Sequence, residues 1–296
     1  MTELNRRELM GRFGLGAMSI FAAPVLMNSL FAAREIFAEE PHVYVSPLNR
    51  LSDEDQIALG KRFSSQLEKE QPSVSNALVD RYLSGLVVKL AAQSQRPDLP
   101  YTIKLINSSI PNAFALPRGF LYVNRGLIQS MSSEGELVAL LAHQIGHVAG
   151  WHADNRLMIF FADHHMLKPL LDNLDKQNGV IEELILRLGG AVSILSSFRF
   201  TPKEEAQADL LGFYEMLRAG WNPNGFLRLF AYLDNLKNTS EGAGNSFLSG
   251  HPNTPERADA IRRELAEVSV PSGAVTDSVR YQQFKAAMGR LPNPSN

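Results

Sequence analysis

Two histidines with the spacing of metal ligands, His143 and His147, follow an apolar run from Leu137 to Ala142. In an α-helix, residues i and i+4 lie about 40° apart around the axis, so the two imidazoles would project side by side. A catalytic zinc site commonly takes two histidines and one carboxylate, with water in the fourth position. The spacing therefore predicts a helix that supplies two ligands to a metal.

Gln144 stands directly after the first of these histidines. In the H-E-x-x-H helix of zinc peptidases, this position holds a glutamate that takes a proton from the attacking water. A glutamine amide can form a hydrogen bond with that water but cannot accept its proton. Loss of a general base typically lowers a rate on the order of 100- to 10,000-fold. The sequence therefore predicts intact metal binding, with hydrolysis absent or very slow.

The third ligand must come from elsewhere in the chain. His152 lies nine residues from His143, about half a turn off the histidine face, so it is not expected to reach the same metal. Ala153 occupies the position six residues after His147 at which metzincins place a third histidine. The metzincin class is therefore excluded.

Glu205 is the better candidate for the third ligand. Glu205 and Asp209 are four residues apart in an expected helix and share one of its faces. Glu205 would bind the metal, while Asp209 would accept a hydrogen bond from a ligand histidine and fix its tautomer. The alternative on spacing alone is a solvated acidic face made of Glu204, Glu205 and Asp209, because such faces are common on helices.

The helix that carries the histidines has a clear predicted start. Ser133 and Glu136 have the S-x-x-E spacing of a capping box. We expect this helix to continue through His152 towards Phe161. Further helices are expected at 52–70 and 75–92, within 166–197 with a break at Gly189-Gly190, and at 202–218, 226–236, 255–268 and 277–288, with a flexible loop over 238–250.

A small sheet is expected between the helical blocks. Residues 101–107 alternate between apolar and polar types, which is typical of a strand. Two short strands, Ala113–Leu116 and Phe120–Val123, flank the turn Pro117-Arg118-Gly119. The predicted fold class is therefore α+β and mainly helical, with a sheet of about three strands packed on the histidine-bearing helix.

The composition narrows the function classes. The 296 residues carry a net charge of −2, which gives no sign of the basic face that a nucleic-acid-binding protein needs. The chain has no cysteine, which excludes a thiolate metal site, a disulfide framework and a cysteine nucleophile. The absence of cysteine also suits an oxidising periplasm.

The first residues are typical of an export signal. Arg6-Arg7 precede an apolar stretch from Phe13 to Ala33, and Ala38 precedes Glu39-Glu40. This pattern predicts an export signal over 1–38, of the twin-arginine kind, although Asn5 stands where Ser or Thr is usual. The alternative is an uncleaved signal that tethers the protein to the inner membrane, since the stretch approaches the ~20 residues that span a bilayer.

Four separated blocks resemble, in order, the gluzincin metallopeptidase family that includes HtpX, BepA and the CAAX prenyl endopeptidase. Together they cover nearly all of residues 50–290. The blocks are Asn112-Ala113-Phe114-Ala115-Leu116-Pro117, similar to NAFALPGG; His143 to His147 with Val148 and His152, similar to HExxHVxxxH; Glu205 to Gly212, similar to ExxADxxG; and His251-Pro252 with Thr254, Glu256 and Arg257, similar to HPxTxER.

The resemblance implies a zincin-like metallopeptidase domain over 51–290, after a short extension over 39–50 and before a tail over 291–296. It implies one Zn²⁺ per chain, bound by His143, His147 and Glu205. Asp209 would accept a hydrogen bond from one of the ligand histidines. His251 would lie close to the metal and gate it or steady an intermediate. The strand formed by Asn112, Ala113, Phe114, Ala115 and Leu116 would receive the substrate as an added strand. Arg257 is expected to hold a structural ion pair against the metal-site helices.

Two departures from the family pattern bear on function. Arg118 replaces the first glycine of the PGG turn, and Gln144 replaces the glutamate. We therefore expect a zinc metalloendopeptidase of the bacterial cell envelope, in protein quality control, with the chain as written inactive or strongly impaired. Its partners would be unfolded or extended polypeptides and envelope proteins. The alternative is a zinc-binding pseudopeptidase that acts as a chaperone or binding module.

Overall fold

The computed structural model describes residues 52–176, 178–239 and 245–294. The predicted export signal over 1–38 and the whole of the predicted extension over 39–50 lie outside the described residues. Among the helices of the described part, none is both long enough and apolar enough to cross a membrane.

A mixed three-stranded sheet forms from the three segments predicted to be strands. Its order is β1 (Thr102–Ile106), β3 (Phe120–Asn124) and β2 (Ala113–Leu116). β1 runs parallel to β3, and β2 runs antiparallel to β3 with Ala113 opposite Val123. The short η2 turn over Pro117–Gly119 joins β2 to β3. β2 is therefore an edge strand, as a substrate-receiving strand would have to be.

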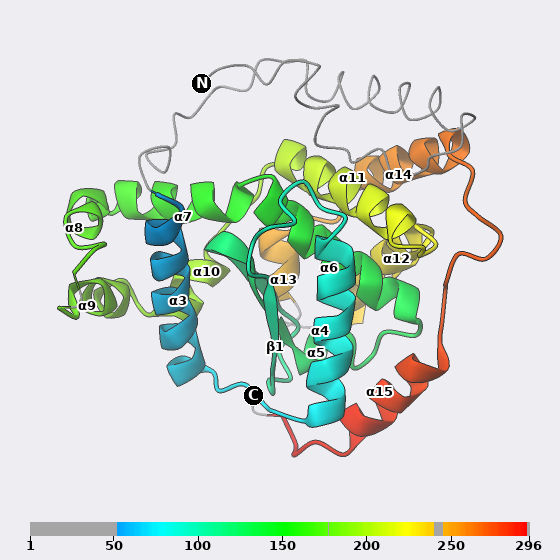
Figure 1. The fold of residues 1–296 in the computed structure, drawn as a ribbon, viewed down its shortest axis with the longest axis horizontal. Coiled ribbons are helices and arrows are strands. Elements are labelled where there is room, and N and C mark those ends of the chain that lie inside the picture. Colours follow the sequence, from blue (N-terminus) through cyan, green and yellow to red (C-terminus); the bar gives the residue numbers. More distant parts are fainter. Residues whose placement is uncertain (1–51, 177, 240–244, 295–296) are drawn as a thin grey trace. The chain divides into compact units, whose positions relative to one another are not determined.

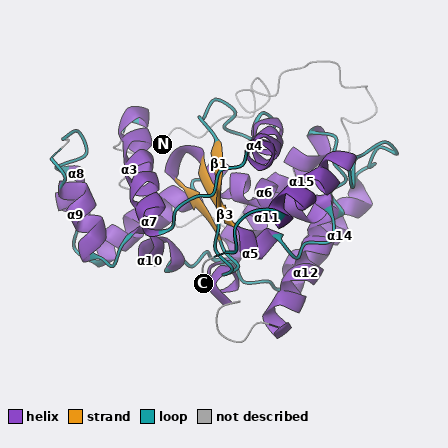
Figure 2. Ribbon diagram, turned by 90° about the horizontal axis from the view of Figure 1, so that it is seen from below, coloured by secondary structure: helices purple, strands orange, loops and turns teal. Residues whose placement is uncertain are grey.

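Helices cover both faces of this sheet (Figures 1 and 2). Alternate strand residues enter different cores: Leu121 packs in the core that includes α6, whereas Tyr122 packs in the core that includes α3. The first core gathers α4 (Ala77–Ala91), α6 (Glu134–Ala149), α11 (Pro202–Arg218), α12 (Gly225–Thr239) and α15 (Val279–Gly289). The second gathers α3 (Asp53–Glu70), α7 (His152–Asp163), α8 (Leu167–Leu171), α9 (Val180–Arg187) and α10 (Ala191–Ser196). The predicted α+β class, with a small sheet on the histidine-bearing helix, is confirmed.

The histidine-bearing helix α6 is buried along all of its 16 residues, as its apolar sequence suggests. Its predicted start is correct: the Ser133 hydroxyl accepts a hydrogen bond from the backbone N–H of Glu136 at 3.4 Å. The Glu136 carboxylate accepts from the backbone N–H of Ser132, one residue earlier than in a capping box. A capped and fully buried helix holds the two candidate ligand histidines in fixed positions.

The expectation that this helix continues through His152 is wrong. α6 ends at Ala149, and Trp151 takes a left-handed conformation with φ of 62° before α7 begins. The Val148 carbonyl accepts hydrogen bonds from the Trp151 N–H and the Arg96 side chain, which satisfies the helix end. The break turns the chain so that His152 points back towards α6.

A second expectation, a flexible loop over 238–250, is wrong at both ends. α12 extends to Thr239, and residues 245–250 form the short helix α13 (Asn245–Gly250), whose Phe247 is buried. Residues 240–244 lie outside the described residues. Two further helices are the short α5 (Arg125–Ile128) and the longer α14 (Pro255–Glu267).

Candidate metal centre

Two helices, α6 and α11, bring the predicted ligands together. α11 begins with Thr201 as N-cap, in a capping box with Glu204, and with Pro202 in its first turn. Glu204 caps this helix and forms an ion pair with Arg156. The next residue, Glu205, is rotated about 100° around the helix and is buried. Glu205 is 1% exposed and Asp209 is 2% exposed, so the alternative of a solvated acidic face is wrong.

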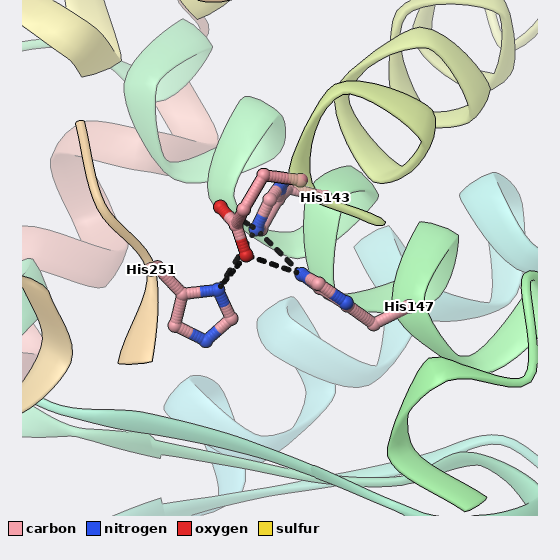
Figure 3. Close-up of side chains that lie close together, drawn as sticks. His143, His147 and His251 are labelled. Carbon is pink, nitrogen blue, oxygen red and sulfur yellow. Dashed lines mark hydrogen bonds and ion pairs between the residues drawn. The ribbon is translucent and has the colours of Figure 1, made fainter. Parts of the chain in front are cut away.

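Four buried side chains converge at one point: His143, His147, Glu205 and His251. Figure 3 shows the three imidazoles pointing towards one another. The Nε2 atoms of His143 and His147 are 3.0 Å apart, and His251 Nδ1 lies 3.2 Å from His143 Nε2. Glu205 Oε1 lies 3.2 Å from His147 Nε2 and 2.9 Å from His251 Nδ1.

This donor set fits Zn²⁺. Zinc bonds of about 2.0–2.2 Å in a tetrahedron place ligand atoms roughly 3.3–3.6 Å apart, close to the separations found here. Burial, followed by the nearby His143 charge, lowers the pKa of His147 well below its ordinary value. Burial would raise the pKa of Glu205, but the charges of His251, Arg257 and His143 outweigh it and hold that pKa well below its usual range. A neutral imidazole and an ionised carboxylate are the forms that bind a metal.

Asp209 and Arg257 fix the orientation of His143. A carboxylate can only accept, so the Asp209 contact at 2.8 Å requires the hydrogen of His143 on Nδ1 and leaves Nε2 free to bind a metal. Arg257 donates two hydrogen bonds to Asp209, from Nε at 2.6 Å and from Nη2 at 2.7 Å. Arg257 Nη1 also lies 2.6 Å from Glu205 Oε2. The predicted ion pair of Arg257 therefore joins Glu205 and Asp209, two carboxylates of α11.

His152 takes part in a contact that sequence reasoning missed. As expected, it is not among the four converging residues, but its Nδ1 lies 3.1 Å from Nδ1 of His147. With Gln207 Oε1 accepting from His152 Nε2–H at 2.9 Å, His152 Nδ1 is left as an acceptor for His147 Nδ1–H. This series of hydrogen bonds leaves Nε2 of His147 free for a metal. The available signal was Gln207, which lies between Glu205 and Asp209, two residues from each.

Gln144 is buried at 2% exposure beside these ligands. Within the described part of the chain, neither its amide oxygen nor its amide nitrogen has a hydrogen-bond partner. A buried amide without partners costs on the order of 1–3 kcal/mol, so such positions in native proteins usually have a functional reason. Here the amide is available to a water molecule or a bound substrate.

Aromatic side chains enclose the open side of the centre. The Phe247 ring stacks on His251, with centroids 4.5 Å apart, and the Phe200 ring lies 3.9 Å from the His147 ring. Phe200 lies five residues before Glu205 and Phe247 four residues before His251, but neither belongs to a motif, so sequence reasoning did not predict their place at the centre. They set the low-dielectric surroundings of the ligands and strengthen electrostatic interactions among them.

The predicted substrate strand lies beside the centre. Asn112, Ala113, Phe114 and Ala115 line a pocket that His251 also lines, whereas Leu116 is fully buried in the core on the α3 side. Among the described residues, no backbone hydrogen bond joins the outer edge of β2 to another segment. Arg118, at φ of 63°, is buried with its guanidinium over the Trp151 ring, so it does not extend over this edge.

Comparison with known protein families finds one that matches this chain. A family model described as Peptidase family M48 matches residues 77–265, which is more than half of the chain and includes α6, α11 and the converging residues. The same matched segment contains the sheet, β2 included.

Several characterised proteins are similar to this chain. Mitochondrial metalloendopeptidase OMA1 of Schizosaccharomyces pombe is 28% identical over 189 residues, 64% of this chain and 54% of that protein. The beta-barrel assembly-enhancing protease of Escherichia coli is 24% identical over 193 residues, 62% of this chain and 38% of that protein. Metalloprotease LoiP of Escherichia coli is 27% identical over 168 residues, 56% of this chain and 64% of that protein. The chain thus matches less than two thirds of the length of each.

Proposed function

The chain belongs to peptidase family M48, and on this premise we propose that it is a zinc-dependent metalloendopeptidase of the bacterial cell envelope, disabled or strongly slowed by Gln144. The observation that carries the proposal is the buried convergence of His143, His147, Glu205 and His251. Within this group, on a family M48 domain, His143, His147 and Glu205 have the composition of a hydrolytic zinc site, which leaves one position for water.

The residues of the centre have distinct roles in this proposal. Zinc bound there supplies a water of lowered pKa and polarises the scissile carbonyl. His143 and His147 would hold it through Nε2, and Glu205 through its carboxylate. Asp209 keeps His143 in the correct tautomer, and Arg257 keeps Asp209 and Glu205 ionised and in place. His251, whose Nδ1 contacts Glu205, would occupy the remaining position or control access to it.

Gln144 is the reason for expecting little hydrolysis. Its amide can donate to or accept from a water molecule, but it has no site that takes up the proton removed from that water. A glutamate at this position would supply that site without any other change in the centre. The remaining constellation, including Asp209 and Arg257, is complete, which favours a protease disabled at one side chain over a lineage that lost the whole reaction.

The second candidate function rests on the same residue. A chain that keeps its ligands but has Gln144 in place of a base would bind zinc and extended polypeptides without cutting them. It would then act as a chaperone or binding module. Among the described residues, no segment forms backbone hydrogen bonds with the outer edge of β2. This supports capture of an extended chain in either case, because an added strand gains backbone hydrogen bonds with little dependence on sequence.

The envelope location and the quality-control role rest on the sequence. Arg6-Arg7 and the apolar stretch that follows support export, with an uncleaved membrane tether as the alternative. Unfolded or extended envelope proteins would be the substrates. Expression of the full chain, followed by release of the periplasm by osmotic shock, tests this: recovery with the cytoplasmic fraction would contradict export, and recovery with membranes would indicate the tether.

The deciding experiment compares the chain as written with Gln144→Glu, each loaded with zinc, on unfolded casein. Cleavage by the Gln144→Glu protein alone would support a protease disabled at one position. Gln144→Leu is the matched control, since it keeps the ligands, lacks both a base and a hydrogen-bonding amide, and should stay inactive. One zinc per chain in all three proteins, with no cleavage by any, would sink the protease proposal and favour the binding role.

A further inference from the structure

Two residues with strained backbones, from distant parts of the chain, contact each other. Among the described residues, three that are not glycine have a positive φ: Arg118, Trp151 and His165. Arg118 lies in the η2 turn between β2 and β3, and Trp151 lies between α6 and α7. The guanidinium carbon of Arg118 lies 5.1 Å from the centre of the Trp151 ring. A bulky residue is disfavoured in the left-handed region, so contacts made by the two side chains must offset the strain.

The Trp151 ring is held by two guanidinium groups. The guanidinium carbon of Arg96 lies 3.6 Å from the ring centre, and Arg96 Nη1 donates a hydrogen bond to the Val148 carbonyl at the end of α6. Arg118 is 2% exposed, and a desolvated cation interacts more strongly with an aromatic face than an exposed one does. Since the Trp151 side chain is 40% exposed, these cations replace part of the packing that a buried ring would have.

A carboxylate in the first turn of α7 interacts with the same two cations. Asp154 is fully buried, and within the described part of the chain neither of its carboxylate oxygens accepts a hydrogen bond from another residue. Burial raises the pKa of Asp154 to about 6, while the charges of Arg96 and Arg118 act in the opposite direction. Arg118 therefore acts on α7 at two positions: on Trp151 through the ring, and on Asp154 through charge.

His152 lies between these two positions. It is the first residue of α7, directly after Trp151 and two residues before Asp154. Its Nδ1 lies 3.1 Å from Nδ1 of His147, the contact that leaves Nε2 of His147 free for a metal. A change in the backbone of Trp151 would rotate the first turn of α7 and move the His152 imidazole. The orientation of His152 thus depends on its neighbours in the chain, and Arg118 interacts with both of them.

The turn that carries Arg118 is itself fixed by its surroundings. α3 lies directly against it, since a Cβ added at Gly60 would be 2.7 Å from the Pro117 carbonyl oxygen. The strands on either side of the turn pair with each other, with Leu116 opposite Phe120. These backbone contacts prevent the turn from shifting, so the Arg118 side chain extends from a fixed position.

We infer that Arg118 is a positioning residue for the metal centre. Its guanidinium holds the first turn of α7 so that His152 accepts the hydrogen bond from Nδ1–H of His147. The inference rests on the proposed function only in taking His147 as a zinc ligand. The family pattern has a glycine in place of Arg118, and a glycine has no side chain that could reach α7. The arginine thus adds, in this chain, a connection between the end of β2 and the metal centre.

The test variants remove the guanidinium without adding backbone strain. Arg118→Asn is suitable because asparagine adopts the left-handed conformation more readily than other residues that have a side chain. Arg118→Lys keeps a cation but loses the planar group that stacks on a ring. Arg125→Asn is the matched control: Arg125 is 4% exposed, and its hydrogen bonds go to Asn107, Gln129 and Pro292 rather than to α7 or the metal group.

The first measurement determines the tautomers of the imidazoles in the zinc-free protein. The histidines of the chain as written are labelled with a nitrogen isotope, and proton–nitrogen correlation spectra show which ring nitrogen carries the hydrogen. The unchanged chain and Arg125→Asn should have the hydrogen of His147 on Nδ1 and that of His152 on Nε2. Arg118→Asn should give mixed tautomers at both rings, and Arg118→Lys should recover part of the order. A purely structural role would change the unfolding midpoint and leave the tautomers as they are.

The second measurement is zinc affinity, by competition with a chelator. Arg118→Asn should bind zinc about 10-fold more weakly, the low end of the range for residues behind metal ligands, and Arg125→Asn should bind it unchanged. Trp151→Asn keeps a residue that tolerates the left-handed turn and removes the ring. The effect of Arg118→Asn should be smaller in the Trp151→Asn protein than in the unchanged chain, because the two residues act through one contact.

The outcomes separate this inference from the proposed function. Unchanged tautomers and unchanged zinc affinity in Arg118→Asn would overturn the inference, whatever happens to stability. Equal effects of Arg118→Asn with and without the Trp151 ring would also overturn it. Should Arg118→Asn fail to fold, Arg118→Lys and Trp151→Asn decide by the same two measurements. A chain that binds no zinc at all would overturn the proposed function, and the tautomers of the zinc-free protein would still decide the role of Arg118.

Discussion

Gly146 on α6 lies against the backbone of Ala208 on α11, so closely that a Cβ added at Gly146 would be 2.5 Å from the Ala208 carbonyl oxygen. Gly212 makes the reciprocal approach from α11, where an added Cβ would be 2.8 Å from the carbonyl carbon of Ala142. Gly146 lies one residue before a ligand histidine, and Ala208 one residue before Asp209. The close crossing therefore sets the distance between the two halves of the metal centre.

Gly146→Ala should separate α6 from α11. The added methyl meets backbone, which cannot rotate away, so we expect the free energy of unfolding to fall by about 1–3 kcal/mol. Zinc affinity should fall as well, because Glu205 moves away from the histidines. Chemical denaturation without zinc and competition with a metal chelator measure the two effects. Gly85→Ala on α4 is the control: nothing lies within 4 Å of its added Cβ, so stability should rise by about 0.5–1 kcal/mol. Equal effects of the two substitutions would contradict the role given to the crossing.

Arg257→Met should destabilise the zinc-free protein. It leaves the buried carboxylates of Glu205 and Asp209 without their shared cation, and breaking such a buried pair costs about 3–5 kcal/mol. Zinc should restore part of the loss, since it supplies positive charge at Glu205. Denaturation with EDTA and with zinc gives both values. Arg257→Lys should recover little, because an ammonium cannot reproduce the forked contact to Asp209. A loss below about 1 kcal/mol, typical of an exposed ion pair, would show that this network is not what holds α14 to α11.

Gln207→Leu tests the hydrogen bonds from Gln207 through His152 that fix the tautomer of His147. Without the Gln207 amide oxygen, His152 can carry its hydrogen on Nδ1 instead of Nε2. His147 Nδ1–H then has no acceptor, and the tautomer of His147 is no longer fixed. Residues behind metal ligands typically change metal affinity about 10- to 100-fold, and we expect a decrease of that size in competition with a chelator. Gln207→Glu keeps an acceptor and should retain or raise the affinity. An unchanged affinity in Gln207→Leu would limit the Gln207 contact to packing.

Asp154→Asn tests a pH effect away from the ligands. Burial raises the pKa of Asp154 to about 6 from its ordinary 3.8, although the charges of Arg96 and Arg118 oppose this. A raised folded-state pKa means that the folded protein binds the proton more tightly, so stability falls as the pH rises from about 4 to about 6 and stays low above it. The full effect is of order 3 kcal/mol. The difference in unfolding free energy between Asp154→Asn and the unchanged chain should grow over this window. A difference independent of pH would show that Asp154 titrates normally.

Several features of the fold and of the metal centre followed from the sequence because they depend on short separations. The i,i+4 spacing of His143 and His147 fixes their common direction once a helix forms, and the Ser133 cap fixes where that helix begins. The same logic placed Glu205 and Asp209 on one face. Alternation predicted the strand within 101–107, and the turn at Pro117-Arg118-Gly119 predicted the two short strands that flank it. Family resemblance supplied the pairing between blocks that no local rule provides.

The tertiary structure decided how these local pieces meet. The left-handed Trp151 separates α6, which ends at Ala149, from α7, although the helix was expected to continue through His152, and it turns His152 towards His147. The glycine crossing at Gly146 set the approach of α11, and the α13 helix brought Phe247 and His251 to the centre from about 100 residues away. Residue spacing along a helix is set by covalent geometry, so the sequence reveals it. Contacts between distant segments depend on packing of whole side-chain surfaces, which only the folded chain determines.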